Sequence, residues 1–168
     1  RKAFASLVLC VLLAPALLAQ ASPWKRDGLW GFLAADGSWK IQPAYLEAGP
    51  FLNGVAKVRA IVLDAKDTQD DGKKWGFLKE DGRWLVAPSY DDLKNFSEGY
   101  ACVEYRKRWG VVDSAGKVVV KPRFEDLWSF HEGKALAYFE GGFGWIASSG
   151  QWVIKPDFQG GGDFSQGL

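Results

Sequence analysis

The chain has 168 residues, of which 48% are hydrophobic and 24% charged, an ordinary balance that excludes a disordered chain and a membrane-embedded protein as first interpretations. Its 21 Lys and Arg are offset by 20 Asp and Glu, so no strong overall field attracts nucleic acid or an anionic membrane. We therefore expect one compact unit without a nucleic-acid partner.

Residues 1–21 have the layout of a secretory signal peptide. A basic start at Arg1-Lys2 precedes an apolar run that ends in the small-x-small sequence Ala19-Gln20-Ala21. Cleavage before Ser22 would leave no stable membrane span, and because the chain lacks an initiator Met we expect the segment to be incomplete at its start. A retained anchor is the alternative, although residues 3–19 lie at the lower end of the roughly 17 to 25 residues that a spanning helix uses.

Signal cleavage would also remove Cys10 and leave Cys102 alone. An exported domain with one Cys has no internal disulfide, so its stability must come from packing. Because Cys102 lies in a mostly apolar run, we expect it to behave as a buried small hydrophobe.

A pattern recurs four times along residues 29–168, within a domain that we expect to span 22–168. The first residue of the pattern is called position zero, and later residues are named by their offset from it. Position zero is Trp30, Trp75, Trp109 and Phe143, each followed by Gly. Offset seven is Gly37, Gly82, Gly116 and Gly150. Offset thirteen is Pro43, Pro88, Pro122 and Pro156; offset twenty-one is Phe51, Phe96, Phe130 and Phe164. The units are 29–72, 73–107, 108–141 and 142–168, and we expect the last to be truncated, with further repeats beyond it. The extra residues of the first unit, 61–72, are read as a loop.

Each unit is predicted to contain three strands, as its second copy illustrates. Residues 75–79 and 83–87 form a hairpin around Gly82, which supplies the positive φ of the turn. Apolar residues alternate with polar ones in the second strand, and Pro88 is expected to end that strand. A connecting segment that begins with an aromatic residue and an acidic pair leads through Phe96 to a third strand at 100–105.

These elements predict an all-β fold, a tandem array of ~34-residue three-stranded repeats. A unit of this length is short for a propeller blade of roughly 40 residues or more, which has four strands. We therefore favour an open curved β stack over a closed propeller.

The sequence Lys74-Trp75-Gly76, followed by a turn Gly, Pro-x-aromatic and Phe-x-Glu-Gly, resembles the WG repeat, also called the KWG repeat, of bacterial proteins. Phe143 departs from the pattern at position zero, and Asn53 and Gln166 replace the Glu. The resemblance implies a tandem β-strand repeat without a common catalytic activity, often exported. It supports secretion or location in the periplasm.

Aromatic residues fall into recurring and non-recurring classes. Recurring Trp residues are expected to form the core, because a side chain present in every unit is most simply explained by packing; they are Trp30, Trp75 and Trp109 at position zero, and Trp39, Trp84 and Trp152 at offset nine. Non-recurring Trp128, Tyr138 and Tyr105 are the candidates for a binding surface, with local packing as the alternative.

The sequence contains no familiar catalytic or metal-binding motif. Its single His, His131, lies at a variable position of the Phe-x-Glu-Gly turn. The repeated acidic pairs, Asp91-Asp92 and Glu125-Asp126, are interpreted as a solvated connecting segment. We therefore expect no cofactor, no metal and no enzymatic activity.

Two functional hypotheses follow. The first is a non-catalytic exported scaffold that binds a protein, a peptide or a cell-envelope glycan. The second is an accessory binding module of a larger envelope or polysaccharide-acting enzyme whose catalytic part is not in this chain. A purely structural spacer is a third possibility.

Overall fold

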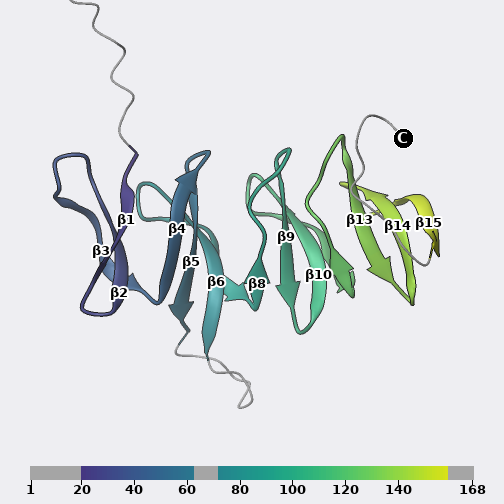
Figure 1. The fold of residues 1–168 in the computed structure, drawn as a ribbon, viewed down its shortest axis with the longest axis horizontal. Helices are drawn as coiled ribbons and strands as arrows, with labels where there is room; N and C mark the ends of the chain where they lie inside the picture. The colour runs from purple at the N-terminus through teal and green to yellow at the C-terminus, as the bar shows by residue number, and fades with distance from the viewer. Residues whose placement is uncertain (1–19, 63–71, 159–168) are drawn as a thin grey trace, which may run out of the picture.

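A computed structural model describes residues 20–62 and 72–158, and every regular element in these ranges is a β-strand (Figure 1). The strands form four small antiparallel sheets that follow one another along the long axis, and none closes into a barrel or propeller. The predicted all-β fold and open tandem array are confirmed. The described residues do not include most of the signal-peptide segment, residues 63–71 of the loop expected at 61–72, or Phe164.

The sheets are numbered in chain order. Sheet 1 contains β1 (Ser22–Arg26), β2 (Leu29–Leu33) and β3 (Trp39–Tyr45). Sheet 2 contains β4 (Glu47–Leu52), β5 (Val55–Ile61), β6 (Lys73–Lys79) and β7 (Trp84–Tyr90). Sheet 3 contains β8 (Asp92–Leu93), β9 (Tyr100–Tyr105), β10 (Arg108–Asp113) and β11 (Val118–Phe124). Sheet 4 contains β12 (Asp126–Leu127), β13 (Lys134–Phe139), β14 (Gly142–Ala147) and β15 (Trp152–Phe158).

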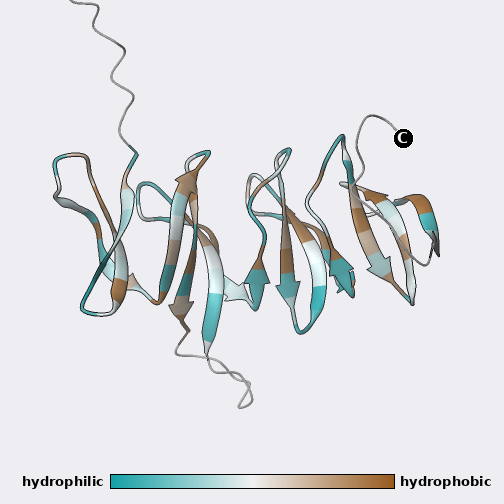
Figure 2. Ribbon diagram, viewed as in Figure 1, coloured by the Kyte–Doolittle hydropathy of each residue, from teal (hydrophilic) through white to brown (hydrophobic). Residues whose placement is uncertain are grey.

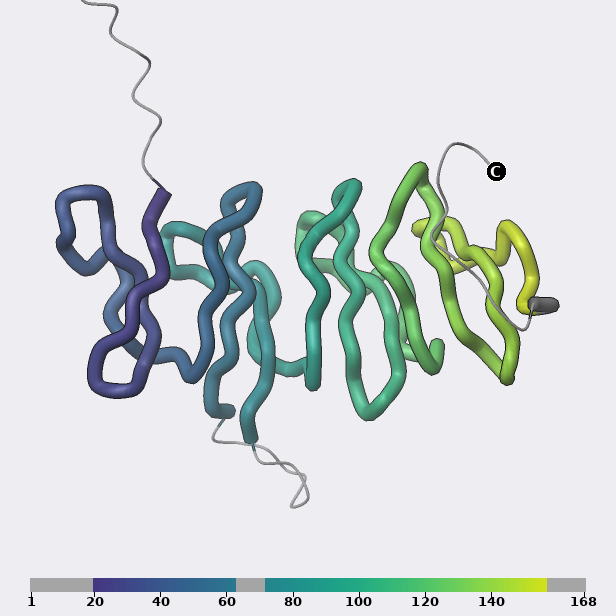
Figure 3. The backbone as a smooth tube through the Cα atoms, viewed as in Figure 1, coloured from purple at the N-terminus to yellow at the C-terminus, as the bar shows by residue number. Residues whose placement is uncertain are grey.

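Sheets 2, 3 and 4 each cross the boundary between two sequence units. The third strand of one unit pairs with the first hairpin strand of the next, as β9 does with β10. A two-residue turn at Arg106-Lys107 joins these strands, and both turn residues have positive φ, which matches the twist of a tight hairpin. The connecting segment adds a short fourth strand, here β8. Figure 3 follows the chain from the last strand of each sheet into the next sheet.

The Trp-Gly and Pro positions are linked by a close backbone approach. A Cβ on Gly76 would lie 2.6 Å from the carbonyl oxygen of Val86 and 2.9 Å from the nitrogen of Pro88, so only Gly fits there. The register shifts between Trp75 and Phe77 mark the irregularity. Strand β7 continues through Pro88 to Tyr90, so the expectation that Pro ends the strand is wrong. An edge strand tolerates Pro because one side of its backbone needs no ladder partner.

Three apolar layers lie between successive sheets. The layer between sheets 1 and 2 includes Phe32, Phe51, Ala56, Val58 and Leu78. The layer between sheets 2 and 3 includes Phe77, Val86, Leu93, Ala101, Val103 and Val112. The layer between sheets 3 and 4 includes Trp109, Val111, Phe124, Leu127, Phe130 and Ile146. Apolar residues concentrate along the strands in Figure 2, and most turns are hydrophilic. Both faces of an inner sheet are therefore covered.

The recurring Trp residues lie mainly at the margins of these layers. Trp109 is buried, with 8% of its surface exposed, but Trp84 is 37% exposed and the other four are partly exposed. The prediction that they form the core is therefore right for Trp109, wrong for Trp84 and only partly right for the other four. Trp84 extends from the edge strand β7 toward sheet 1, where its ring lies edge-on to Tyr45 at 5.9 Å. The fully buried aromatic side chains are Phe32, Phe77, Phe124 and Phe130.

Candidate binding sites at the sheet interfaces

The three predicted surface aromatics occupy two different places. Trp128 and Tyr138 both lie against Phe143 on sheet 4, with ring centroids 6.0 and 4.9 Å from that ring. Tyr105 is 42% exposed at the end of β9, with the guanidinium carbon of Arg106 5.4 Å from its ring. The structure therefore brings the first two together and separates the third.

A lysine ammonium bridges sheets 2 and 3 beside the position-zero Trp. Lys57 Nζ donates to the carbonyl oxygen of Leu93 at 2.6 Å and to a carboxylate oxygen of Asp92 at 3.1 Å. The same ammonium lies 4.4 Å from the ring centroid of Trp75, within the range of a cation–π interaction. This cluster connects β5 and β6 of sheet 2 with β8 of sheet 3.

An equivalent ammonium joins sheets 3 and 4, although it comes from another position of the repeat. Lys94 Nζ donates to the carbonyl oxygen of Leu127 at 2.5 Å and lies 4.6 Å from the ring of Trp109. Lys94 lies opposite Cys102, to whose carbonyl its backbone N–H donates. The matching place opposite Lys57 is Gly49. Aligning the copies does not reveal this shared site, because the lysine comes from β5 in one case and from the residue after β8 in the other.

A groove of about 320 Å³ opens beside the first of these ammonium groups. It is lined by Glu47, Ala48, Gly49, Pro50, Lys57, Trp75 and Asn95. The space exists because Gly49 has no side chain where sheet 3 has Lys94. At the next interface, Trp128 lies 5.3 Å from the Lys94 ammonium and Trp109 is buried.

The Glu of the Phe-x-Glu-Gly motif connects neighbouring turns. The two carboxylate oxygens of Glu98 accept hydrogen bonds from the backbone N–H groups of Glu132 and Gly133, at 2.7 and 2.8 Å. Ser97 Oγ also donates to the carbonyl oxygen of Phe130 at 2.7 Å. Each contact reaches from sheet 3 to the corresponding turn region of sheet 4. The motif therefore links sheet 3 to sheet 4 through hydrogen bonds.

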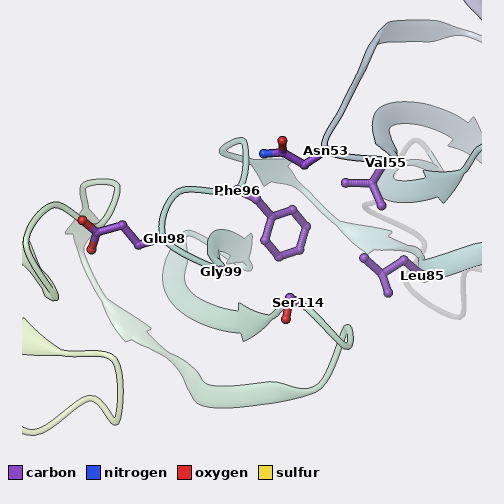
Figure 4. Close-up of a pocket in the computed structure, with 7 residues that line it drawn as sticks. All are labelled: Asn53, Val55, Leu85, Phe96, Glu98, Gly99 and Ser114. Carbon is purple, nitrogen blue, oxygen red and sulfur yellow. The ribbon is translucent and has the colours of Figure 1, made fainter. Parts of the chain in front are cut away.

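A pocket of about 150 Å³ lies at the corresponding place between sheets 2 and 3. It is lined by Asn53, Val55, Leu85, Phe96, Glu98, Gly99 and Ser114. Figure 4 shows the Phe96 ring at its centre, with the Glu98 side chain directed away from the ring. Asn53 occupies the repeat position of Glu98, and Val55 that of Tyr100. Both are smaller than their counterparts.

The acidic pairs have structural partners. Asp91 accepts a hydrogen bond from the backbone N–H of Arg106 at 2.6 Å and pairs with Lys74, and Glu125 accepts one from the N–H of Glu140 at 3.3 Å. The first member of each pair therefore supports a hairpin turn. The interpretation of these residues as a merely solvated segment is too simple, because their bonds hold neighbouring strands together.

Two titratable groups in sheet 3 have perturbed pKa values. Burial raises the pKa of the Cys102 thiol to about 12, and its Sγ donates to the carbonyl oxygen of Trp128 at 3.2 Å. The Cys102 thiol is therefore held neutral, as its expected role as a buried hydrophobe requires. Burial also raises the pKa of Glu104, with smaller contributions from the carboxylates of Asp91, Asp92 and Asp126.

His131 is exposed in its turn, next to Lys134 in an isolated bridge. Within residues 20–62 and 72–158, no group of three or more His, Cys, Asp or Glu side chains is arranged to hold a metal ion. The same ranges contain no helix long and apolar enough to cross a bilayer.

Comparison with known proteins identifies the repeat. The family described as "WG containing repeat" matches residues 30–60, 75–108, 109–142 and 143–168. Searches among curated proteins and among solved structures give no significant match. The matched residues make up most of the sequence and coincide with the four units read from it, so the chain belongs to the WG repeat family.

Proposed function

We propose that this protein is a non-catalytic, exported scaffold whose groove beside Trp75 binds an extended peptide segment of another protein. The observation that carries the proposal is the difference between two equivalent places. The groove of about 320 Å³ is open between sheets 2 and 3, whereas Lys94 and Trp128 occupy the corresponding place between sheets 3 and 4.

The groove has the size and composition of a recognition site. Its volume lies within the range of about 300 to 1,000 Å³ that is usual for ligand pockets. Pro50 and Trp75 supply apolar surface. At the rim, the Glu47 carboxylate can accept hydrogen bonds and the Asn95 amide can accept or donate them. Aromatic-lined grooves of this kind suit extended peptides.

A peptide is favoured over an envelope glycan by the state of the Trp75 ring. The Lys57 ammonium lies 4.4 Å from the ring centroid, so part of the indole is already engaged by a cation. Carbohydrate recognition by stacking would require a free aromatic face. A peptide can instead use the edge of the ring, the Pro50 surface and the polar rim.

Gly49→Lys provides a direct test, because it places at the groove the residue that sheet 3 has at position 94. A Cβ on Gly49 would make only an ordinary 3.7 Å contact with the carbonyl oxygen of Lys57, so the variant should fold. The protein is used to select binders from a library of random peptides displayed on phage. Selected peptides should bind Gly49→Lys at least tenfold more weakly than the wild type.

Leu29→Lys is the matched control, because it adds the same charge at an exposed residue of β2. It should leave peptide affinity unchanged. Failure to select any binder, or equal affinity for Gly49→Lys and the wild type, would contradict the proposal. Binding of purified cell-wall glycan that is lost in Gly49→Lys would instead assign the groove to a glycan.

A further inference from the structure

Two consecutive turns of the array have the same backbone shape but different neighbours. Glu98 and Gly99 have φ values of 52° and 83°, and Glu132 and Gly133 have values of 50° and 73°. The second turn donates both of its N–H groups to the Glu98 carboxylate. Among the described residues, the N–H groups of Glu98 and Gly99 have no hydrogen-bond partner.

Asn53 explains this difference. It occupies the repeat position from which Glu98 reaches the next turn, but its side chain is one methylene shorter and offers a single amide oxygen in place of two carboxylate oxygens. Its side chain makes no hydrogen bond to the described part of the Glu98-Gly99 turn. The pocket between Asn53 and Gly99 therefore lies where a carboxylate lies in the following repeat.

A second small residue enlarges the pocket. Between sheets 3 and 4, the Tyr100 ring lies 5.3 Å from the ring of Phe130, which is fully buried. Between sheets 2 and 3, Val55 stands at the position of Tyr100, and Phe96 is only partly buried. The resulting space of about 150 Å³ equals the volume of an engineered apolar cavity known to admit benzene.

We propose that this pocket binds a carboxylate attached to an aromatic group. The ring would lie against Phe96, Val55 and Leu85, and the carboxylate would accept hydrogen bonds from the N–H groups of Glu98 and Gly99. Both parts of the ligand replace groups that the following repeat supplies from its own residues, namely the Tyr100 ring and the Glu98 carboxylate. This site is separate from the groove beside Trp75, and the inference goes beyond the proposed function.

The electrostatics of the pocket allow an anion. Two N–H donors aimed at one carboxylate form charge-assisted hydrogen bonds, which are roughly twice as strong as neutral ones. The Glu98 carboxylate of the lining is directed away from Phe96 and is engaged by the next turn (Figure 4). The contact between Glu98 and the next turn also shows that the fold accommodates a carboxylate beside the Glu132 position.

Titration with 3-phenylpropionate, followed by backbone amide NMR, tests the proposal on the whole protein. The Glu98 and Gly99 amide signals should shift and saturate. The neutral 3-phenylpropanamide and the ringless acetate should each bind at least tenfold more weakly. Equal binding of the acid and the amide would overturn the carboxylate assignment, and absence of shifts at Glu98 and Gly99 would overturn the site.

Two substitutions copied from the next repeat provide the variant test. Asn53→Glu supplies the internal carboxylate and Val55→Tyr supplies the ring, so each should reduce 3-phenylpropionate affinity at least tenfold. Unchanged affinity in both would overturn the proposal. If either variant fails to fold, the comparison of acid and amide on the wild type still decides. Gly49→Lys should leave this binding unchanged, which separates the site from the groove.

A peptide ending in Phe identifies the source of the ligand. Acetyl-Gly-Gly-Phe with a free carboxylate should bind, and the same peptide with a C-terminal amide should bind at least tenfold more weakly. Tighter binding of the peptide acid than of 3-phenylpropionate assigns the pocket to the carboxyl ends of polypeptides. The reverse order assigns it to free aromatic acids, and equal binding of peptide acid and amide contradicts the proposal.

Discussion

The interface between sheets 2 and 3 and the interface between sheets 3 and 4 are built from the same repeat, yet the first has a groove and a pocket at places that larger side chains occupy in the second. Lys94 and Trp128 fill one margin of the later interface, and Glu98 and Tyr100 fill the other. The earlier interface has smaller side chains at the matching places, and a groove and a pocket result. Shared residues build the array, and the residues that differ between copies determine where it is open.

The largest expected effect comes from the repeated Phe at the two interfaces. Phe130→Ala removes a fully buried ring and should lower the free energy of unfolding by about 3 to 5 kcal/mol. Phe96→Ala should cost clearly less, because Phe96 is partly exposed and borders the pocket. Urea denaturation of both variants measures the difference. Equal losses would show that the pocket is closed in solution.

The turn contacts should give a smaller difference. Glu98→Gln leaves one amide oxygen for two N–H donors and should cost about 1 to 2 kcal/mol. Asn53→Gly should change stability little, because the Asn53 side chain makes no hydrogen bond to the described residues and Gly suits the positive φ of 52° at this position. Amide hydrogen exchange provides a local readout: Gly133 should lose protection in Glu98→Gln. Unchanged protection of the Gly133 amide would contradict the role assigned to Glu98.

Exchanging the second turn residue between the hairpins of sheets 3 and 4 should change the stability of the protein in opposite directions. Arg106 and Lys107 both have positive φ, 51° and 60°, whereas the matching turn of sheet 4 has Gly141 at its second position. Lys107→Gly should therefore stabilise the protein by about 1 kcal/mol. Gly141→Lys should destabilise it by a similar amount. Thermal unfolding checks both, and a loss of stability in Lys107→Gly would contradict the reasoning.

Glu104 should produce the smallest effect, and it depends on pH. Its pKa is raised above the ordinary 4.5, first by burial and then by Asp91, Asp92 and Asp126. The folded state therefore binds the proton more tightly than the unfolded state, and stability is lost as pH rises through this range. Glu104→Gln should slightly raise the urea midpoint at pH 7 and leave it unchanged at pH 3. A gain at pH 3 alone would reverse the sign and refute this account.

The sequence predicted the array because its signals are local. Gly82 and its equivalents identified the turns, and the two-residue period of the second strand identified its faces. The pairing between the third strand of one unit and the hairpin of the next unit was harder to predict from the sequence. It depends on the turns Arg106-Lys107 and Glu140-Gly141, which share no residue at either position. The expectation about Pro88 failed because a backbone bulge beside Gly76 carries the strand past it.

Little of the candidate sites could be read from the sequence. Lys57 and Lys94 make the same kind of contact from different positions of the repeat, so aligning the copies does not place them together. The hydrogen-bond partners of Glu98 are backbone N–H groups, which cannot be identified from the types of residue in the sequence. Trp128 and Tyr138 were singled out as non-recurring aromatics, and they contact Phe143, but the hollows lie where small residues replaced large ones.

The offset between sequence unit and sheet has a consequence for how such a protein can change its length. Sheets 2, 3 and 4 each draw strands from two successive units. Deleting the 34 residues from 75 to 108 would join Lys74 to Trp109. Strand β5 would then be followed by a hairpin equivalent to its own. The same holds for a deletion that begins at any other point of the repeat. Gain or loss of one period therefore lengthens or shortens the row by one whole sheet, wherever the genetic breakpoints fall.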